Sequence, residues 1–287
     1  MTKIIALTCL AMLAFAANSV LTRQALGSGA MDALGFAGVR LVSGAIMLAL
    51  LVTLRAPKSW RAVPRLGNWQ QAGALLGYAI AFSLAYALLS TGTGALILFV
   101  SVQFGMIARA IATGDRPGGI EWLGIAIAIG AFVYLVSPGL SAPDPLGSFL
   151  MVIAGLSWAA YSLLGRGSAR PLADAAGSFV RLVPIALIMA IWGIVQHPPT
   201  SAGVLLAIGS GAIASGLGYA IWYAALPFLS RTRAAVVQLS VPAIAALGAA
   251  LLFGEVLSAR LIVASIVILG GIAIAIVGAE RRRVPLV

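Results

Sequence analysis

The chain has 287 residues, of which 62% are hydrophobic and 9% are charged, against about 45–50% and about 25% in an average soluble domain. With a mean hydropathy of +1.09, these values exclude a soluble globular protein and predict an all-α integral membrane protein. The excess of 18 Lys and Arg over 7 Asp and Glu falls in gaps between apolar runs. It therefore indicates membrane topology rather than a nucleic-acid partner.

Ten runs of the chain are long and apolar enough to cross a bilayer, which needs roughly 20 residues. The expected spans are 4–25, 33–54, 69–90, 94–112, 119–137, 147–165, 174–195, 202–226, 233–253 and 259–278. The first run also resembles a secretory signal with a cleavage site at residues 14–17. A similar segment occurs later within the chain, and this favours a first span that is not cleaved from the protein.

The basic residues are distributed unequally between the two ends of these spans. With a cytoplasmic N-terminus, only Arg23 and Arg260 face the opposite side. The cytoplasmic side then carries Lys3, Arg55, Lys58, Arg61, Arg65, Arg109, Arg116, Arg166, Arg170, Arg231, Arg233, Arg281, Arg282 and Arg283. This asymmetry predicts that both termini are cytoplasmic and that the protein lies in the cell inner membrane. Because every loop is short, the helix bundle itself must carry the function.

The second half of the sequence repeats the first. Residues 77–80 (GYAI) recur at 218–221, and residues 39–42 (VRLV) recur at the same spacing at 180–183. Five spans in each half give the halves opposite orientations in the membrane. We therefore expect a 5+5 inverted-topology repeat, 1–138 and 139–287, around a central cavity. Such pseudo-symmetry is typical of secondary transporters that work by alternating access.

Particular residues accompany this arrangement and carry a family resemblance. Arg40 and Arg181 lie early in the second and seventh spans, and Pro242 is followed by Gly254-Glu255 before the last span. With ten spans, this pattern resembles the drug/metabolite transporter superfamily, within it the EamA-type exporters, and most of all the YddG-type amino acid exporters. The resemblance implies a bundle with a central cavity that exports small metabolites. Gln103 replaces the first-half counterpart of Pro242, so the two halves are unequal at the centre.

Polar and aromatic side chains at mid-membrane depth are the candidates for contact with a solute, because lipid-facing positions have no use for them. Aromatic rings stack on flat or apolar solutes, and hydroxyl or amide groups bind amino and carboxyl groups. Packing between helices is the alternative role for each residue. The candidate substrate-binding residues are Asn18, Tyr78, Phe82, Phe99, Gln103, Trp158, Tyr161, Tyr219, Tyr223 and Gln238.

Two arginines lie deep in their helices. Arg40 and Arg181 are each roughly 12 Å from the start of a span at 1.5 Å per residue. Each guanidinium has two alternative roles. It binds a substrate carboxylate, or it stabilises the fold by bonding to helix-end carbonyls.

The acidic residues lie at or near the ends of spans. A proton-coupled carrier usually keeps a carboxylate or histidine at mid-depth, so we expect a facilitator, with coupling through Glu255 as the alternative. Cys9 and His197 are the only cysteine and histidine, and we expect no metal site and no cofactor. An intramembrane enzyme would need paired carboxylates or a nucleophile constellation, which this sequence lacks.

The sequence thus predicts an inner-membrane exporter of amino acids, aromatic or otherwise neutral, that is not an enzyme and that functions as a monomer. The alternatives are export of another small metabolite or a hydrophobic drug by the same fold, or a channel or scaffold.

Overall fold

The computed structural model describes residues 2–55, 63, 66–139, 142–229 and 231–283. Within these ranges all regular structure is helical, and ten helical stretches are long and apolar enough to cross a membrane. The expected all-α membrane fold is therefore confirmed. Some basic residues used to predict topology lie outside the described residues (Lys58, Arg61 and Arg65), as do the side chains of Arg231, Arg282 and Arg283.

The ten spans follow one another in the order expected, and each begins within about three residues of its predicted start. The first seven are α1 (Thr2–Gly27), α2 (Ala33–Arg55), α3 (Trp69–Leu88), α4 (Thr91–Ala112), α5 (Gly119–Val136), α6 (Pro145–Leu164) and α7 (Pro171–Gln196). The eighth contains α8 (Ser201–Ile208), a π-helix (Gly209–Leu217), α9 (Gly218–Ala225) and a 3-10 helix (Leu226–Phe228); the ninth contains α10 (Arg231–Gln238) and α11 (Ser240–Phe253); the tenth is α12 (Ala259–Arg283).

Acidic and amide side chains begin several of these helices. The first turn of a helix leaves backbone N–H groups without partners. Asp32 Oδ1 accepts hydrogen bonds from the backbone N–H groups of Leu34 and Gly35, at 2.8 and 2.9 Å. Asn68 and Asp144 act in the same way at the starts of α3 and α6. Carboxylates at the ends of spans thus act as helix caps.

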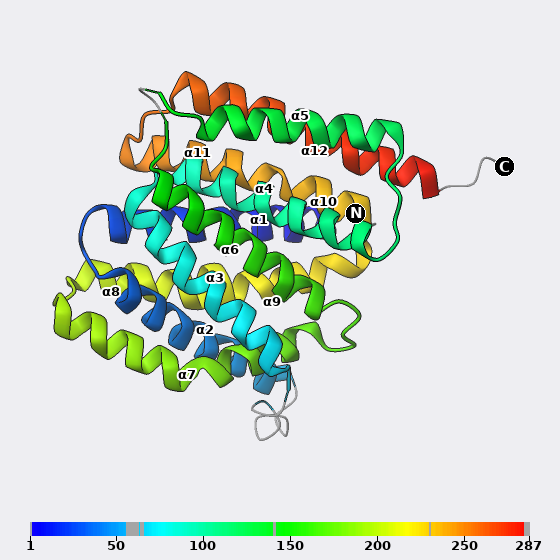
Figure 1. Cartoon of the computed structure of the whole chain (residues 1–287). Helices are drawn as coiled ribbons and strands as arrows, with labels where there is room; N and C mark the ends of the chain where they lie inside the picture. The colour runs from blue at the N-terminus through cyan, green and yellow to red at the C-terminus, as the bar shows by residue number, and fades with distance from the viewer. Residues whose placement is uncertain (1, 56–62, 64–65, 140–141, 230, 284–287) are drawn as a thin grey trace.

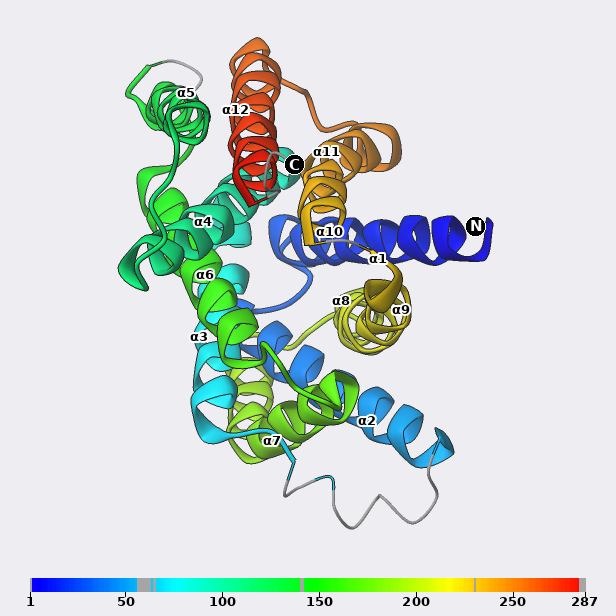
Figure 2. The same ribbon diagram turned by 90° about the vertical axis from the view of Figure 1, so that its right-hand side faces the viewer.

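The helices pack in pairs across the bundle (Figure 1, Figure 2). α5 lies along α12 at one edge, and α2 lies along α7 at the opposite edge. Between these pairs, α1 contacts α11 and the eighth span, while α6 contacts α3 and α4. α1 begins and α12 ends at the same end of the bundle; we call this the terminal end and the other the far end.

Small residues allow the paired helices to approach closely. A Cβ atom on Gly38 of α2 would lie 2.4 Å from the carbonyl oxygen of Ala186 in α7. A Cβ on Gly124 of α5 would lie 2.5 Å from the carbonyl oxygen of Gly271 in α12. Because lipid is as apolar as the side chains, such close backbone packing is a main source of helix association in a membrane.

The eighth and ninth spans differ from the uninterrupted helices expected at 202–226 and 233–253. In the ninth span, Pro242 has no N–H to donate to the carbonyl of Gln238, and the helix breaks at Leu239. In the eighth, residues 209–217 widen into a π-helix, a feature frequent at functional sites. There the backbone of Gly211 approaches α2 so closely that a Cβ atom would lie 2.1 Å from the Arg40 carbonyl oxygen.

Candidate functional site

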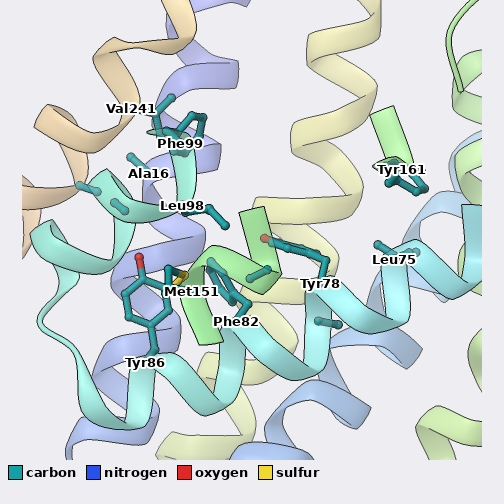
Figure 3. Close-up of a cluster of buried hydrophobic side chains, with 14 of the residues drawn as sticks. Ala16, Leu75, Tyr78, Phe82, Tyr86, Leu98, Phe99, Met151, Tyr161 and Val241 are labelled. Atoms are coloured by element: carbon teal, nitrogen blue, oxygen red, sulfur yellow. The ribbon is translucent and has the colours of Figure 1, made fainter. Parts of the chain in front are cut away.

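Three aromatic side chains lie along one face of α3, as their four-residue spacing predicts. The ring centroids of Tyr78 and Phe82 are 5.0 Å apart, and those of Phe82 and Tyr86 are 4.7 Å apart. All three side chains are buried. Figure 3 shows them projecting together from α3, with Met151 of α6 beside them.

Trp158 of α6 connects this face to the second half of the chain. Its ring centroid lies 4.9 Å from Tyr78 of α3 and 5.5 Å from Tyr219 of α9. It also stacks on Tyr161 of its own helix at 5.2 Å. We call Tyr78, Phe82, Trp158, Tyr161 and Tyr219 the aromatic cluster. Its members come from three helices and from both halves of the chain, so they meet at the interface between the halves.

Further rings surround Tyr219. Its ring centroid lies 6.0 Å from Phe15 of α1, 6.1 Å from Phe179 of α7 and 6.4 Å from Tyr223 of α9. The sequence did not single out Phe15 or Phe179 as site residues. Phe15 was detectable, because it lies three residues before Asn18 and therefore on the same face of α1. Phe179 had no local signal.

A polar network borders the aromatic cluster. Asn18 Nδ2 donates to the hydroxyl oxygen of Tyr78 at 3.2 Å, and Asn18 Oδ1 accepts from the Ser210 hydroxyl at 2.6 Å. Arg40 Nη2 donates to the same Tyr78 oxygen at 3.0 Å. Ser210 lies in the π-helix, which had no signal in the sequence, so it was not singled out. The network joins α1, α2, α3 and the eighth span.

Arg40 is enclosed by protein. Its side chain is 2% exposed, and its guanidinium carbon lies 5.0 Å from the centroid of the Tyr78 ring and 4.8 Å from that of Phe82. An arginine at the centre of a membrane helix costs about 2.5–3.5 kcal/mol on insertion scales. The two ring contacts and one hydrogen bond offset part of this cost.

Arg181, the repeat counterpart of Arg40, has different surroundings. Its Nη1 donates to the carbonyl oxygens of Leu66 and Gly177. Its guanidinium carbon lies 5.7 Å from the centroid of the Trp69 ring. Arg181 therefore ties α7 to the segment that leads into α3, and it does not join the aromatic cluster through these contacts.

The other candidates lie apart from this network. Phe99 is buried on α4, near Ala16 of α1 and Val241 of α11 (Figure 3). Gln103 is half-buried on the same helix. Gln238 donates to the carbonyl oxygen of Ala234 in its own helix at 3.2 Å. These contacts do not bring the two glutamines together.

Exposure differs little among the side chains of the site. Phe82 and Tyr86 of α3 are fully buried, and Tyr78, Tyr161 and Tyr219 are buried as well. Trp158 of α6 and Tyr223 of α9 are half-buried. Trp158 is thus the most exposed side chain of a largely enclosed aromatic cluster.

The far end is held by a charged contact. Glu255, which follows α11, accepts hydrogen bonds from the backbone N–H and hydroxyl of Thr91 at 2.8 and 2.9 Å. Its carboxylate lies 3.6 Å from Arg23 Nε, and Arg23 donates to the carbonyl oxygen of Tyr86. This contact joins α1, α3, α4 and the segment after α11.

Two pockets stand out, and the aromatic cluster lines neither. One, of about 390 Å³, lies between α2, α7 and α8, with Val39, Ile46 and Leu187 in its lining. The expected central cavity therefore stays a prediction. Among the described residues, no group of three or more His, Cys, Asp or Glu side chains is placed to hold a metal ion.

Comparison with known proteins adds a family and several relatives. A model of the EamA-like transporter family matches residues 145–277. The Pseudomonas aeruginosa protein PA1977 is 50% identical over 270 residues, which cover 93% of this chain and 92% of that protein. An Escherichia coli K12 protein named "Probable amino-acid metabolite efflux pump" is 27% identical over 233 residues, covering 73% of this chain and 78% of that protein.

Two further similarities cover a shorter match and a solved structure. The Escherichia coli K12 inner membrane transporter YedA is 28% identical over 178 residues, which cover 57% of this chain and 54% of that protein. A solved crystal structure with 19% sequence identity matches 96% of this chain and 98% of its own with a TM-score of 0.65. At this identity the structural likeness concerns the fold alone.

Proposed function

Because the chain belongs to the EamA-like transporter family, we propose that it exports amino acids across the cell inner membrane by alternating access, with aromatic or other neutral amino acids preferred. Membership of a transporter family favours transport over the intramembrane enzyme considered above. The names of the Escherichia coli relatives, an amino-acid metabolite efflux pump and an inner membrane transporter, support both the substrate class and the location. Another small metabolite or a hydrophobic drug remains the alternative substrate.

Alternating access rests on the proposed inverted repeat of 1–138 and 139–287. Such a repeat would exchange α2 with α7, α4 with the ninth span and α5 with α12. Each of these three pairs is in contact, which is the arrangement expected for related helices that lie near a two-fold axis. One chain would then hold both halves of the carrier, which supports function as a monomer.

The orientation of the chain is part of the same proposal. In the part of the chain that the structure describes, most basic residues lie toward the terminal end, so this end is assigned to the cytoplasm by the positive-inside rule. An exporter takes its substrate from this end.

The observation that carries the proposed substrate class is the position of Trp158. It lies between Tyr78 of the first half and Tyr219 of the second, at 4.9 and 5.5 Å. Aromatic rings at the interface of two moving halves offer stacking surfaces for a flat side chain. A relative movement of the halves would change these contacts and release the solute.

Counterflow in proteoliposomes tests the proposal. Vesicles that contain the purified protein and excess unlabelled phenylalanine are expected to accumulate external labelled phenylalanine transiently above its equilibrium level. A carrier exchanges one bound solute for another, whereas a channel gives no such overshoot. Protein-free vesicles serve as the control. Overshoot with another solute class and none with phenylalanine would reject the amino acid proposal.

The second expected result concerns whether transport is coupled to a proton gradient. We expect phenylalanine uptake to proceed at equal rates with and without a pH gradient, because Glu255 caps α4 and pairs with Arg23 at the far end instead of lying at mid-depth. Glu255→Gln keeps the size of the side chain and removes its charge, so it should also show no response to the gradient. Stimulation of the natural protein by a pH gradient, lost in Glu255→Gln, would show proton coupling through this carboxylate.

A further inference from the structure

We propose that Arg40 and Tyr78 form a carboxylate-binding subsite, so that the transported solute is a carboxylic acid whose side chain lies against Trp158. This inference rests on the proposed transport function and narrows its substrate class. It is drawn from donor groups that the fold leaves without acceptors.

The first such donor is on Arg40. Nη2 of this guanidinium donates to Tyr78, but Nη1 is buried and has no hydrogen-bond partner. The ion pair of Arg23 with Glu255 lies at the far end and does not involve Arg40. A buried guanidinium without a carboxylate keeps a full positive charge in a medium of low dielectric constant, which favours an anion at that point.

The second donor is the Tyr78 hydroxyl group. Its oxygen accepts hydrogen bonds from Asn18 Nδ2 and Arg40 Nη2, at 3.2 and 3.0 Å. A phenol that accepts twice still has its own O–H to donate. The nearby Asn18 Oδ1 already accepts from Ser210 at 2.6 Å. Two donors are therefore free at this point, the Arg40 Nη1 group and the Tyr78 O–H, and an anion requires such donors.

Five of the seven acidic side chains of the chain are used elsewhere. Asp32, Glu121, Asp144 and Glu255 accept hydrogen bonds from backbone N–H groups near helix ends, and Asp174 does so from Gly67. None of these bonds involves Arg40. An acceptor from outside the chain would satisfy Arg40 Nη1, and a planar carboxylate matches the guanidinium fork.

Tyr78 also determines what lies beside the carboxylate. Its ring is 4.9 Å from Trp158, which in turn is 5.5 Å from Tyr219. A carboxylate held by Arg40 and the Tyr78 hydroxyl would place the rest of the solute against these rings. Arg181, the repeat counterpart, uses its Nη1 on backbone carbonyls. Arg181 therefore does not offer the free Nη1 donor that Arg40 has.

Competition among three related compounds tests the subsite on the natural protein, without any substitution. Phenylalanine and 3-phenylpropionate both carry a carboxylate, whereas phenylalaninamide keeps the ring and the amine but has no carboxylate. We expect the two acids to inhibit labelled phenylalanine uptake at concentrations at least about tenfold lower than the amide. The reason is that loss of a hydrogen bond to a charged group weakens binding by about tenfold or more. Equal inhibition by phenylalanine and phenylalaninamide would overturn the proposal.

Substitution of Arg40 gives the second measurement. In Arg40→Met the ratio of inhibition by acid and amide should fall to about one, and in Arg40→Lys it should lie between that of Met and that of the natural protein. Arg260→Met is the matched control, because Arg260 bonds the carbonyl oxygen of Tyr134 at the far end. This control should keep the natural ratio. An unchanged ratio in Arg40→Met would overturn the proposal.

Thermal unfolding of the purified protein separates this inference from the proposed function. We expect 3-phenylpropionate to raise the unfolding temperature of the natural protein and of Arg260→Met, but not that of Arg40→Met. This shift does not depend on transport. Absence of phenylalanine counterflow would reject the proposed function alone, whereas absence of any carboxylate-dependent shift in the natural protein would reject the subsite. If Arg40→Met does not fold, the three compounds on the natural protein still decide the question.

Discussion

Replacing Trp158 by leucine is expected to lower phenylalanine transport at least about tenfold, measured as the initial rate of uptake per reconstituted protein. Trp158 contacts three rings, those of Tyr78, Tyr161 and Tyr219. Aromatic pairs contribute about 0.5–1.5 kcal/mol each, and about 1.4 kcal/mol corresponds to a tenfold change. Leucine fills part of the volume but offers no stacking surface to a solute. Trp158→Phe should retain an intermediate rate.

Trp192→Leu is the control for this substitution. Trp192 lies on α7 and is 56% exposed on the outside of the bundle, so its replacement removes the same atoms without touching the aromatic cluster. Its rate should stay within about twofold of the natural protein, because isolated surface substitutions usually change little. Equal rates in Trp158→Leu and the natural protein would show that the aromatic cluster does not contact the solute.

Replacing Gly271 by leucine is expected to destabilise the protein by about 3 kcal/mol, at the upper end of the usual cost of overpacking. A Cβ atom on Gly271 would lie 2.7 Å from the carbonyl oxygen of Gly124 and 2.9 Å from the backbone nitrogen of Ala128. Both neighbours are backbone atoms of α5, so no side-chain rotation relieves the clash. The two helices would have to separate. The thermal unfolding midpoint in detergent and the yield of monodisperse protein measure the effect.

The adjacent glycine supplies the matched control for this prediction. A Cβ atom on Gly270 meets nothing within 4 Å, and the residue is exposed on α12. Gly270→Leu should therefore keep the natural midpoint, with a small gain from a better helix former. If both leucine variants unfold at the same temperature, close packing of α5 on α12 is not a source of stability.

The positions of the spans were predictable because the signals are local. Each span is an apolar run of sufficient length bounded by polar or small residues. The break between the third and fourth spans was expected at 91–93, and it lies at 89–90. The interruptions of the eighth and ninth spans were not predicted. Pro242 did offer a signal for the second of these, since it removes a backbone donor. The π-helix at 209–217 follows from packing against α2 and had none.

The candidate site was predictable in part, as the helices were. The four-residue spacing predicted that Tyr78 and Phe82 lie on one face of α3. The repeated sequence predicted a role for Tyr219, because it matches Tyr78. Phe99, Gln103 and Gln238 were chosen by depth alone, and the structure places them outside the aromatic cluster. Depth in a helix does not specify which way a side chain points.

Composition, run length and helical period were enough to specify a ten-span membrane bundle, the ends of most helices and an aromatic face on α3. The difference between Arg40 and Arg181 was hidden, although both occur in the same short motif. Arg40 reaches Tyr78 across 38 residues, and Arg181 reaches Leu66 across 115. Such partners depend on how each helix is rotated and tilted against its neighbours. Rotation and tilt follow from packing of the whole bundle, so only the folded chain separates a guanidinium with a free donor from one that binds backbone carbonyls.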